Sequence, residues 1–212
     1  MEKMEKLKES VLSSFEDGDL DRVDKFIDSV RDSLKSTNSK FGALTFLLVI
    51  SILSYHFYVN GQMTEMSAFG LRIKDIALIK KWFLIVPSLV FLAGASIGYL
   101  RVYQQECIEW LLATYRPKEY KSGIYRLTFP SNYILGLDVL RRQKTKMAKF
   151  IATLASIPFI TGSIIAPIWY IYWAYTKAFV ELGADSSLII SASISGILLL
   201  GGLGVIRESQ KI

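Results

Sequence analysis

The stretch that decides the fold is residues 101–149, RVYQQECIEWLLATYRPKEYKSGIYRLTFPSNYILGLDVLRRQKTKMAK, which lies between two pairs of apolar runs. It contains ten lysines and arginines against four acidic residues, so it alone carries a charge of +6, equal to the net charge of the whole chain. Basic residues that flank membrane spans stay in the cytoplasm. The segment therefore predicts the topology of the chain, and it is where we expect a partner to act.

The apolar residues of the chain are gathered into four blocks. Hydrophobic residues make up 51% of the chain and its mean hydropathy is +0.34, yet strongly polar segments separate the blocks. A helix needs about 20 apolar residues to cross roughly 30 Å of hydrocarbon. By this criterion we predict transmembrane helices at residues 42–59, 82–100, 150–175 and 186–206. The expected fold is an all-α integral membrane protein with four transmembrane helices and cytosolic helical extensions, assembled as an oligomer.

The lysines and arginines also predict which parts of the chain face the cytoplasm. With the N-terminus inside, the predicted cytoplasmic segments hold 20 of the 25 basic residues. This bias predicts a multi-pass protein of the inner (plasma) membrane with both termini in the cytoplasm. The predicted domains are a cytosolic amphipathic helical arm, a transmembrane hairpin, a basic cytosolic segment, a second transmembrane hairpin and a cytosolic tail, at residues 1–41, 42–100, 101–149, 150–206 and 207–212.

The N-terminal arm carries an apolar stripe at helical spacing. After Asp19, a suitable helix N-cap, apolar residues recur three or four positions apart: Leu20, Val23, Phe26, Ile27, Val30 and Leu34. Such a stripe has to pack on something, and two partners are open: the basic segment, or the same helix in a neighbouring subunit. Residues 36–39 are expected to form a short polar linker before the first span.

The outer connections and the third span have features of their own. Residues 60–81 are too apolar for a free loop, so they should lie on the membrane surface or pack on the spans. The third span is longer than a crossing requires and contains Pro158 and Pro167, so we expect it to tilt or to be kinked. Residues 176–185 are then expected to form a short outer turn.

Small residues in the second and fourth spans predict close helix contacts or a pore. Glycines four residues apart let helix backbones approach closely in lipid. Serines four residues apart form a stripe that either packs against another helix or borders water. The candidate residues for span packing or a pore are Gly94, Gly98, Ser187, Ser191, Ser195 and Gly196.

Basic and aromatic residues alternate in the central segment. Cations interleaved with tyrosines can hold phosphates and stack bases, which favours a nucleotide or nucleic-acid ligand or a cytosolic protein partner. The same cations could instead contact anionic lipid headgroups, at about 1 kcal/mol each. The candidate binding residues are Arg116, Lys118, Lys121, Arg126, Arg141, Arg142, Lys144 and Lys146. His56, the only histidine, lies at the end of the first span, where it is either an interfacial residue or a proton sensor.

The sequence contains no recognisable catalytic motif. There is one histidine and one cysteine, Cys107, and there is neither a glycine-rich phosphate loop nor a cluster with metal-ligand spacing. We therefore predict no catalytic residues, no metal and no cofactor. The predicted spans contain no acidic residue, lysine or arginine, and four spans are few for an inverted-repeat transporter.

The layout of a charged helical arm, two transmembrane hairpins and a basic segment between them resembles the four-span membrane effectors of prokaryotic anti-phage defence systems. This resemblance implies a small homo-oligomer governed by a nucleotide or DNA oligomer. Our leading hypothesis is a homo-oligomeric membrane effector or channel that perturbs the inner membrane when its basic region senses a nucleotide, a nucleic acid or a protein partner. The alternatives are a non-channel scaffold that recruits a soluble partner through its cytosolic helices, and a small transporter or lipid-handling protein.

Overall fold

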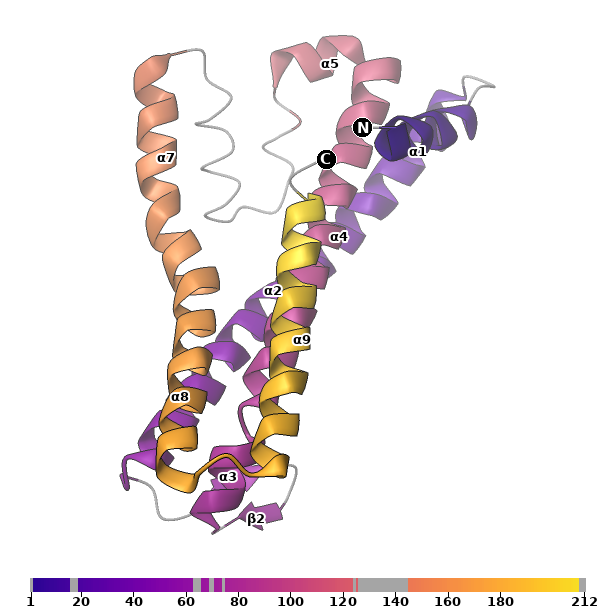
Figure 1. Ribbon diagram of the computed structural model, residues 1–212. Coiled ribbons are helices and arrows are strands. Elements are labelled where there is room, and N and C mark those ends of the chain that lie inside the picture. The colour runs from indigo at the N-terminus through magenta and orange to yellow at the C-terminus, as the bar shows by residue number, and fades with distance from the viewer. Residues whose placement is uncertain are drawn as a thin grey trace.

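The structure, a computed structural model of the chain, describes residues 2–15, 19–62, 66–68, 71–73, 75–123, 125 and 145–209. Long helices dominate it, and one short β-hairpin lies at one end (Figure 1). The elements, in chain order, are α1 Glu2–Ser13, α2 Leu20–Val59, β1 Met66–Ala68, β2 Leu71–Ile73, α3 Ile76–Trp82, α4 Ile85–Tyr115, α5 Pro117–Ser122, α7 Lys146–Ile160, the π-helical turn η2 Thr161–Ile165, α8 Ala166–Leu182 and α9 Ser186–Ser209.

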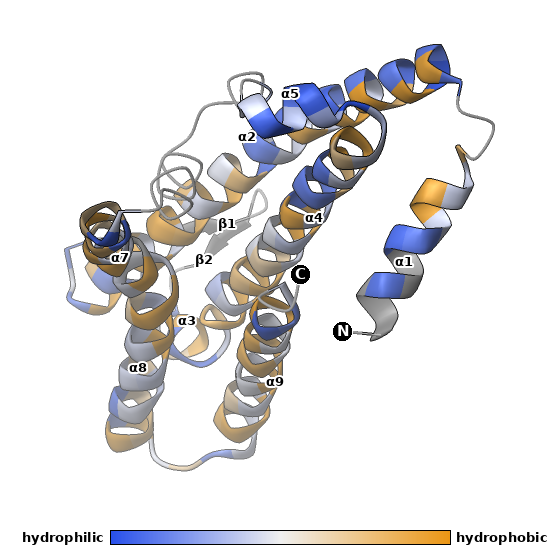
Figure 2. Cartoon of the chain, turned by 90° about the horizontal axis from the view of Figure 1, so that it is seen from above, coloured by the Kyte–Doolittle hydropathy of each residue, from blue (hydrophilic) through white to orange (hydrophobic). Residues whose placement is uncertain are grey.

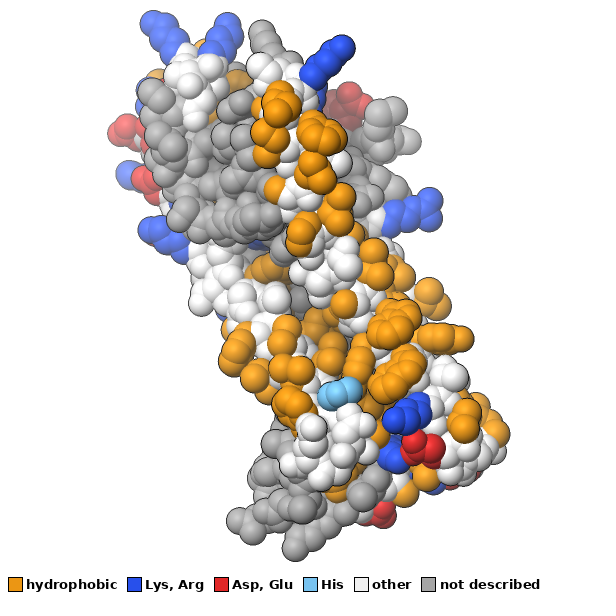
Figure 3. Space-filling view, turned by 90° about the vertical axis from the view of Figure 1, so that its left-hand side faces the viewer, with side chains coloured by type: hydrophobic (Ala, Val, Ile, Leu, Met, Phe, Trp, Pro, Cys, Tyr) orange, Lys and Arg blue, Asp and Glu red, His pale blue; other side chains and the backbone are white. Residues whose placement is uncertain are grey.

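Four helical segments are long and apolar enough to cross a membrane. They are Leu20–Val59, Ala77–Tyr115, Lys146–Leu182 and Ser186–Ser209. Large apolar side chains are exposed along all four, as expected where lipid surrounds a helix. Hydrophobic side chains cover the middle of the face shown in Figure 3, while lysines and arginines gather at its upper end. The prediction of a helical protein with four helices long and apolar enough to span a membrane is confirmed.

Helix α2 runs without a break from Leu20 to Val59. Asp19 caps it as predicted, because its Oδ1 accepts hydrogen bonds from the backbone N–H groups of Asp21 (3.1 Å) and Arg22 (3.3 Å). The expected linker at residues 36–39 is wrong, since these residues are helical. No glycine or proline interrupts this part of the chain, and Thr37 is buried with its hydroxyl bonded to the Ser33 carbonyl oxygen (2.9 Å). Packing therefore outweighs the weak helix propensity of the polar residues.

Helix α4 continues past the membrane segment and ends at Tyr115, before Arg116 and Pro117, as the sequence predicts. It begins later than predicted, because the chain turns at residues 83–84 after α3.

Asp75 caps α3 by accepting from the N–H groups of Ala77 (2.8 Å) and Leu78 (3.2 Å). The β-hairpin precedes α3, with Met66 paired to Ile73. Since α3 packs on α8 and α9, this connection packs on the membrane helices.

The third span is a single helical path of three pieces, α7, η2 and α8. Pro167 follows the π-helical turn, where Ala166 N–H bonds to the Thr161 carbonyl oxygen, five residues back. A proline lacks the N–H for an ordinary helical bond and clashes with the carbonyl four residues earlier, and the wider turn accommodates both. The expected outer turn at residues 176–185 is wrong in its extent. The helix reaches Leu182, and the turn begins at Gly183, whose φ of 76° suits glycine.

Helix α4 lies between α2 and α9 and packs extensively on both. Against α9, the Phe91 ring covers Gly202 so closely that a Cβ there would lie 2.7 Å from a ring carbon. Against α2, the Phe41 ring would lie 3.3 Å from a Cβ at Gly98. The glycines thus allow large rings to fill the space between neighbouring helices.

We predict that Gly202→Ala destabilises the protein by about 1–3 kcal/mol, the usual range for overpacking a filled interior. The added methyl group would force Phe91, which is buried, away from α9. Gly204→Ala is the matched control, because no atom lies within 4 Å of a Cβ at that position and alanine favours the helix. Thermal unfolding in detergent measures both. A Gly202→Ala protein as stable as the Gly204→Ala protein would show that this contact does not hold α4 to α9.

Candidate functional site

We call the end of the molecule formed by α1, residues 19–40 of α2, residues 101–115 of α4, α5 and Tyr125 the head. It is built around one apolar cluster that these elements share. The buried members of the cluster are Phe15, Val23, Ile27, Leu34, Cys107, Ile108, Leu111, Leu112 and Tyr125. The apolar stripe of the N-terminal arm thus packs on the basic segment of its own chain, the first of the two partners that the sequence left open.

Tyrosines tie the head together at its edge. The Tyr115 hydroxyl on α4 donates to the carbonyl oxygens of Phe15 (2.9 Å) and Leu12 (3.3 Å), which anchors the end of α1. Tyr120 on α5 stacks on Tyr125, with ring centroids 5.6 Å apart and an angle of 19° between the ring planes. These contacts place aromatic rings among the basic residues, as the sequence suggested.

An ion pair joins the two long helices at the head. Arg116, at the end of α4, donates through Nη2 to Asp24 Oδ2 of α2 at 2.5 Å. This hydrogen bond raises the pKa of the Arg116 guanidinium, so the arginine stays charged at every pH of interest. Arg22 lies over the Phe15 ring, 5.5 Å from its centroid, and adds a cation–π contact between α2 and the end of α1.

The predicted basic residues are only partly brought together. Lys118 and Lys121 are exposed on α5, next to the paired Arg116. Lys146 is exposed at the start of α7, which stands apart from α5 in Figures 1 and 2. The remaining four predicted residues lie outside the described part of the chain: Arg126, Arg141, Arg142 and Lys144. The predicted cations that the described residues bring together are therefore Arg116, Lys118 and Lys121, beside the Tyr120–Tyr125 stack.

A layer of buried polar side chains lies on α2 and α4 within the head. Thr37 on α2 and Arg101, Gln104 and Glu109 on α4 are all buried. Gln104 Nε2 donates to Ser33 Oγ at 2.8 Å, which links α4 to α2 across this layer. The sequence analysis treated Arg101 as an ordinary cytoplasmic cation and missed the layer. Its signal was the spacing of Arg101, Gln104 and the apolar residues of α4 that follow, which share one helical face.

The serine stripe of α9 is partly sealed inside the chain. The Tyr175 hydroxyl of α8 lies 2.7 Å from Ser191 Oγ and 2.9 Å from Ser195 Oγ. Ser191 also donates to the Lys81 carbonyl oxygen, and all three side chains are buried. Ser191 and Ser195 therefore serve packing within one chain. Ser187 lies at the start of α9 and donates to Asp185 at 2.6 Å.

The predicted glycines have different surroundings. Gly98 packs against the Phe41 ring of α2, as described above. A Cβ at Gly94 or Gly196 would meet no atom within 4 Å. These two positions therefore face open space on the surface of the chain, where lipid or another subunit can approach.

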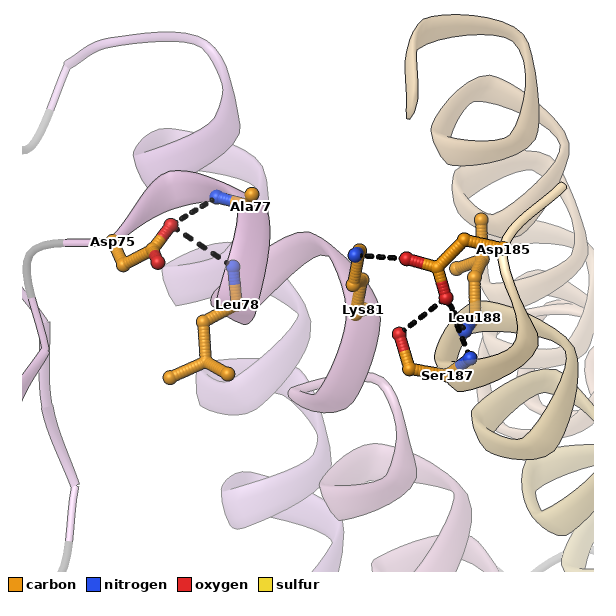
Figure 4. Close-up of polar contacts among 7 residues, drawn as sticks. All are labelled: Asp75, Ala77, Leu78, Lys81, Asp185, Ser187 and Leu188. Atoms are coloured by element: carbon orange, nitrogen blue, oxygen red, sulfur yellow. Dashed lines mark hydrogen bonds and ion pairs between the residues drawn. The ribbon is translucent and has the colours of Figure 1, made fainter. Parts of the chain in front are cut away.

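The end opposite the head is held by two ion pairs, which we call the clasp. Lys80 and Lys81, at the end of α3, pair with Glu181 and Asp185, which flank the α8–α9 turn. Figure 4 shows Asp185 bridging Lys81 and the first turn of α9. The clasp closes the bundle where α3 meets the second hairpin. These pairs could not be predicted from local patterns, because the partners lie 101 and 104 residues apart in the chain.

His56 belongs to a small polar group at the same end of the bundle. Its Nδ1 lies 3.2 Å from the Tyr170 hydroxyl of α8, and its Nε2 lies 3.0 Å from Asn60 Nδ2. The ring also packs on that of Tyr170, with centroids 6.0 Å apart. Its contacts are those of a residue that joins the end of α2 to α8.

Within the described residues, no group of three or more histidine, cysteine, aspartate or glutamate side chains could hold a metal ion. Cys107 is buried in the head cluster.

The clasp predicts a specific response to acid. The hydrogen bond from Lys81, with help from Ser187, holds the pKa of Asp185 well below its usual range. A lowered carboxyl pKa adds stability above the unfolded value of about 3.9, and that stability is lost as the pH falls through the folded value. We predict that Lys81→Met lowers the unfolding temperature at pH 7 and weakens its dependence on pH between about 5 and 2.

Unfolding in detergent, followed at several pH values, tests this. The matched control is Lys177→Met, which removes a cation of α8 whose contact is with the Trp173 ring. If the unfolding temperatures of the unchanged protein and of Lys81→Met depend on pH in the same way, the ion pair does not stabilise the fold.

The Arg116–Asp24 pair predicts a rescue by charge exchange. Asp24→Arg and Arg116→Asp should each increase amide hydrogen exchange in α5 several-fold, because like charges then face each other at positions 24 and 116. The double variant restores opposite charges and should return the exchange to its original rate. Asp32→Arg is the control, since Asp32 pairs only with Lys35 of its own helix. Equal exchange in the single and double variants would mean that the pair does not hold α5.

Comparison with protein families, with curated proteins and with solved structures found no match for this chain. Its function therefore has to be argued from the geometry of the head, the membrane helices and the clasp.

Proposed function

We propose that the protein is a homo-oligomeric membrane effector or channel whose head senses a ligand and controls the membrane helices. In this proposal the head lies in the cytoplasm, as the distribution of basic residues predicts. The ligand is a nucleotide, a nucleic acid or a protein partner, and the response is a change in the permeability of the inner membrane. The setting we propose, anti-phage defence, rests on the architectural resemblance alone.

The observation that carries the proposal is the continuity of α2 and α4. At about 1.5 Å per residue these helices are about 60 Å and 46 Å long. Each contributes one part to the head cluster and another to the membrane cluster that contains Leu48, Val90 and Phe91. A rotation or shift of either helix in the head is therefore transmitted to the membrane part without a flexible joint.

The proposal of an oligomer is supported by the absence of an open polar path along α9 within one chain, among the residues that the structure describes. The serines of α9 that were candidates for a polar path are closed off by Tyr175 in the described structure. Gly94 on α4 and Gly196 on α9 are half-buried, and a Cβ at either position would meet no atom within 4 Å. A permeation path would therefore form between several copies, where such positions allow close contact between chains.

The binding surface of the proposal is the exposed face of α5. Lys118 and Lys121 supply positive charge without a carboxylate partner among the described ion pairs. The neighbouring Tyr120 is partly buried and stacks on Tyr125, which is buried in the head cluster, so Tyr120 is the ring of this pair that a ligand would contact. This combination suits an anionic ligand with phosphates and bases. Movement of α5 would reach α4 directly through Arg116, which caps both helices.

A non-channel scaffold remains the second candidate. The burial of side chains in the head bears on which surface of such a scaffold would bind a soluble partner. Val23, Ile27 and Leu34 of the N-terminal stripe are buried in the head cluster, so these side chains are not available to a soluble partner. Leu20 and Phe26 of the same stripe are exposed. A recruited protein would have to meet the outer face of α2, where Asp28 and Asp32 are exposed beside Phe26, which is 39% exposed.

Ion flux from vesicles that contain the purified protein tests the proposal. We expect potassium release after addition of one of three classes of probe: mononucleotides, cyclic oligonucleotides or short single-stranded DNA. The double variant Lys118→Glu/Lys121→Glu should weaken the response by about tenfold to a hundredfold in probe concentration, at roughly 1 kcal/mol per cation. Lys25→Glu, at an exposed position of α2, is the control.

Two outcomes would contradict the proposal. A monodisperse monomer in detergent and in lipid would remove the oligomeric path. An oligomer that releases no potassium with any probe, but retains a soluble protein through the outer face of α2, would favour the scaffold.

A further inference from the structure

The third span differs from the other three in its apolar length. Residues 150–176 contain no charged side chain and extend about 40 Å at about 1.5 Å per residue. The corresponding uncharged stretches at residues 41–59, 82–100 and 186–206 each extend about 30 Å. The third span therefore exceeds its neighbours by about 10 Å, and a helix that is too long for the bilayer has to tilt, bend or thicken the membrane around it.

The excess length lies in α7. The lower part of the span is held, because α8 packs on α2, α3, α4 and α9, and Ile164 of η2 packs on the membrane cluster. Among the described helices, the only extensive contacts of α7 are with η2, which continues it. Figures 1 and 2 show α7 standing away from α4 and α9. Among the described elements, extensive packing on the third span thus ends at the π-helical turn.

The surface of α7 has the chemistry of a helix in contact with lipid. Lys146 and Lys149 are exposed at its first turn, where their ammonium groups can reach headgroup phosphates. One narrow face of small residues is buried, at Ala148, Ala152 and Ser156. The remaining surface carries large exposed apolar side chains: Met147, Phe150, Ile151, Leu154, Ile157 and Ile160. Acyl chains are the partner that such a surface fits.

The π-helical turn is where the span can bend. Pro158 lies shortly before it and Pro167 shortly after it, so ordinary helical hydrogen bonds are missing on both sides. Kinks in helices concentrate at prolines and at π-turns of this kind. The junction between the packed and unpacked parts of the span therefore coincides with its weakest point.

We propose that α7 is a lipid-contacting arm that pivots at η2, so that its angle to the bundle follows the hydrocarbon thickness of the membrane. In a thick bilayer the whole span stands upright. In a thin bilayer α7 leans away from the bundle toward the interface, where its lysines stay with the headgroups. The proposal does not depend on ion conduction, since a scaffold would carry the same arm.

Distances between spin labels in vesicles test the pivot. The background is Cys107→Ser, because Cys107 is the only cysteine. One label pair joins Met147→Cys on α7 to Lys121→Cys on α5. The vesicles contain phosphatidylcholine with monounsaturated chains of about 14, 18 or 22 carbons, which sets the hydrocarbon thickness. We expect this distance to be about 5–10 Å longer in the thinnest bilayer than in the thickest, the scale of the excess length.

Matched controls separate a pivot from a general change. Leu89→Cys and Ile197→Cys, on the exposed surfaces of α4 and α9, should keep one distance in all three bilayers. Leu154→Lys shortens the uncharged run to residues 155–176, about 33 Å. In this variant the distance between the labels at positions 147 and 121 should no longer depend on bilayer thickness. Leu154→Ala leaves the uncharged run at its full length, so the distance should still depend on thickness.

A distance from Met147 to Lys121 that stays the same in all three bilayers would overturn the proposal. Strong dipolar coupling between chains that each carry a single spin label at position 147 would also overturn the proposal, if it persists at every thickness. A second copy of the chain, rather than lipid, would then cover α7.

Discussion

The packing of α4 between α2 and α9 is the contact on which the rest of the structure depends. It operates under two different driving forces along one helix. In the head, burial of residues such as Ile108 and Leu111 removes apolar surface from water, which stabilises by about 1.5–3 kcal/mol for each large side chain. In the membrane part, lipid is as apolar as the side chains, so only close fit remains. The Phe91 ring against Gly202 supplies that fit.

The polar groups of the bundle lie where each environment tolerates them. Between the membrane helices, the Tyr175 hydroxyl and the serines of α9 satisfy one another, as groups away from water must. At the ends, charged side chains pair across helices: Arg116 with Asp24 in the head, and Lys80 and Lys81 with their partners in the clasp. These contacts hold α2, α3, α4, α8 and α9 as one unit. Among the described residues, α7 takes part in none of these contacts, and we propose that it follows the thickness of the bilayer.

The function that we propose uses this division between a held unit and the parts attached to it. A ligand can shift a conformational equilibrium only by the difference between its affinities for the two states. In this chain such a ligand would act on α5, which is joined to α4 at Arg116 and held to the rest of the head by the tyrosine stack. Because α4 contacts both α2 and α9, a change at α5 would reach three of the four membrane helices.

Much of this architecture follows from local patterns. The four apolar blocks, the cap at Asp19, the end of α4 before Pro117 and the irregularity of the third span were all predictable, because each depends on neighbouring residues and on the thickness of a bilayer. The absence of a break at residues 36–39 was not, since it depends on the burial of Thr37 in the folded chain. Nor was the length of α8, because the residues near its end are held by contacts with α3.

The candidate site shows the same limit. The cations of the central segment and the serines of α9 could be named from their positions, but whether they face solvent or protein could not. Asp24 and Arg116 are 92 residues apart, and Lys81 and Asp185 are 104 apart. The sequence by itself determined the class of protein, the number of membrane helices and their approximate bounds, because hydrophobic length and charge act locally. Only the tertiary structure decided which charges pair, which serines are sealed and that α7 stands apart, because those outcomes depend on which helices become neighbours.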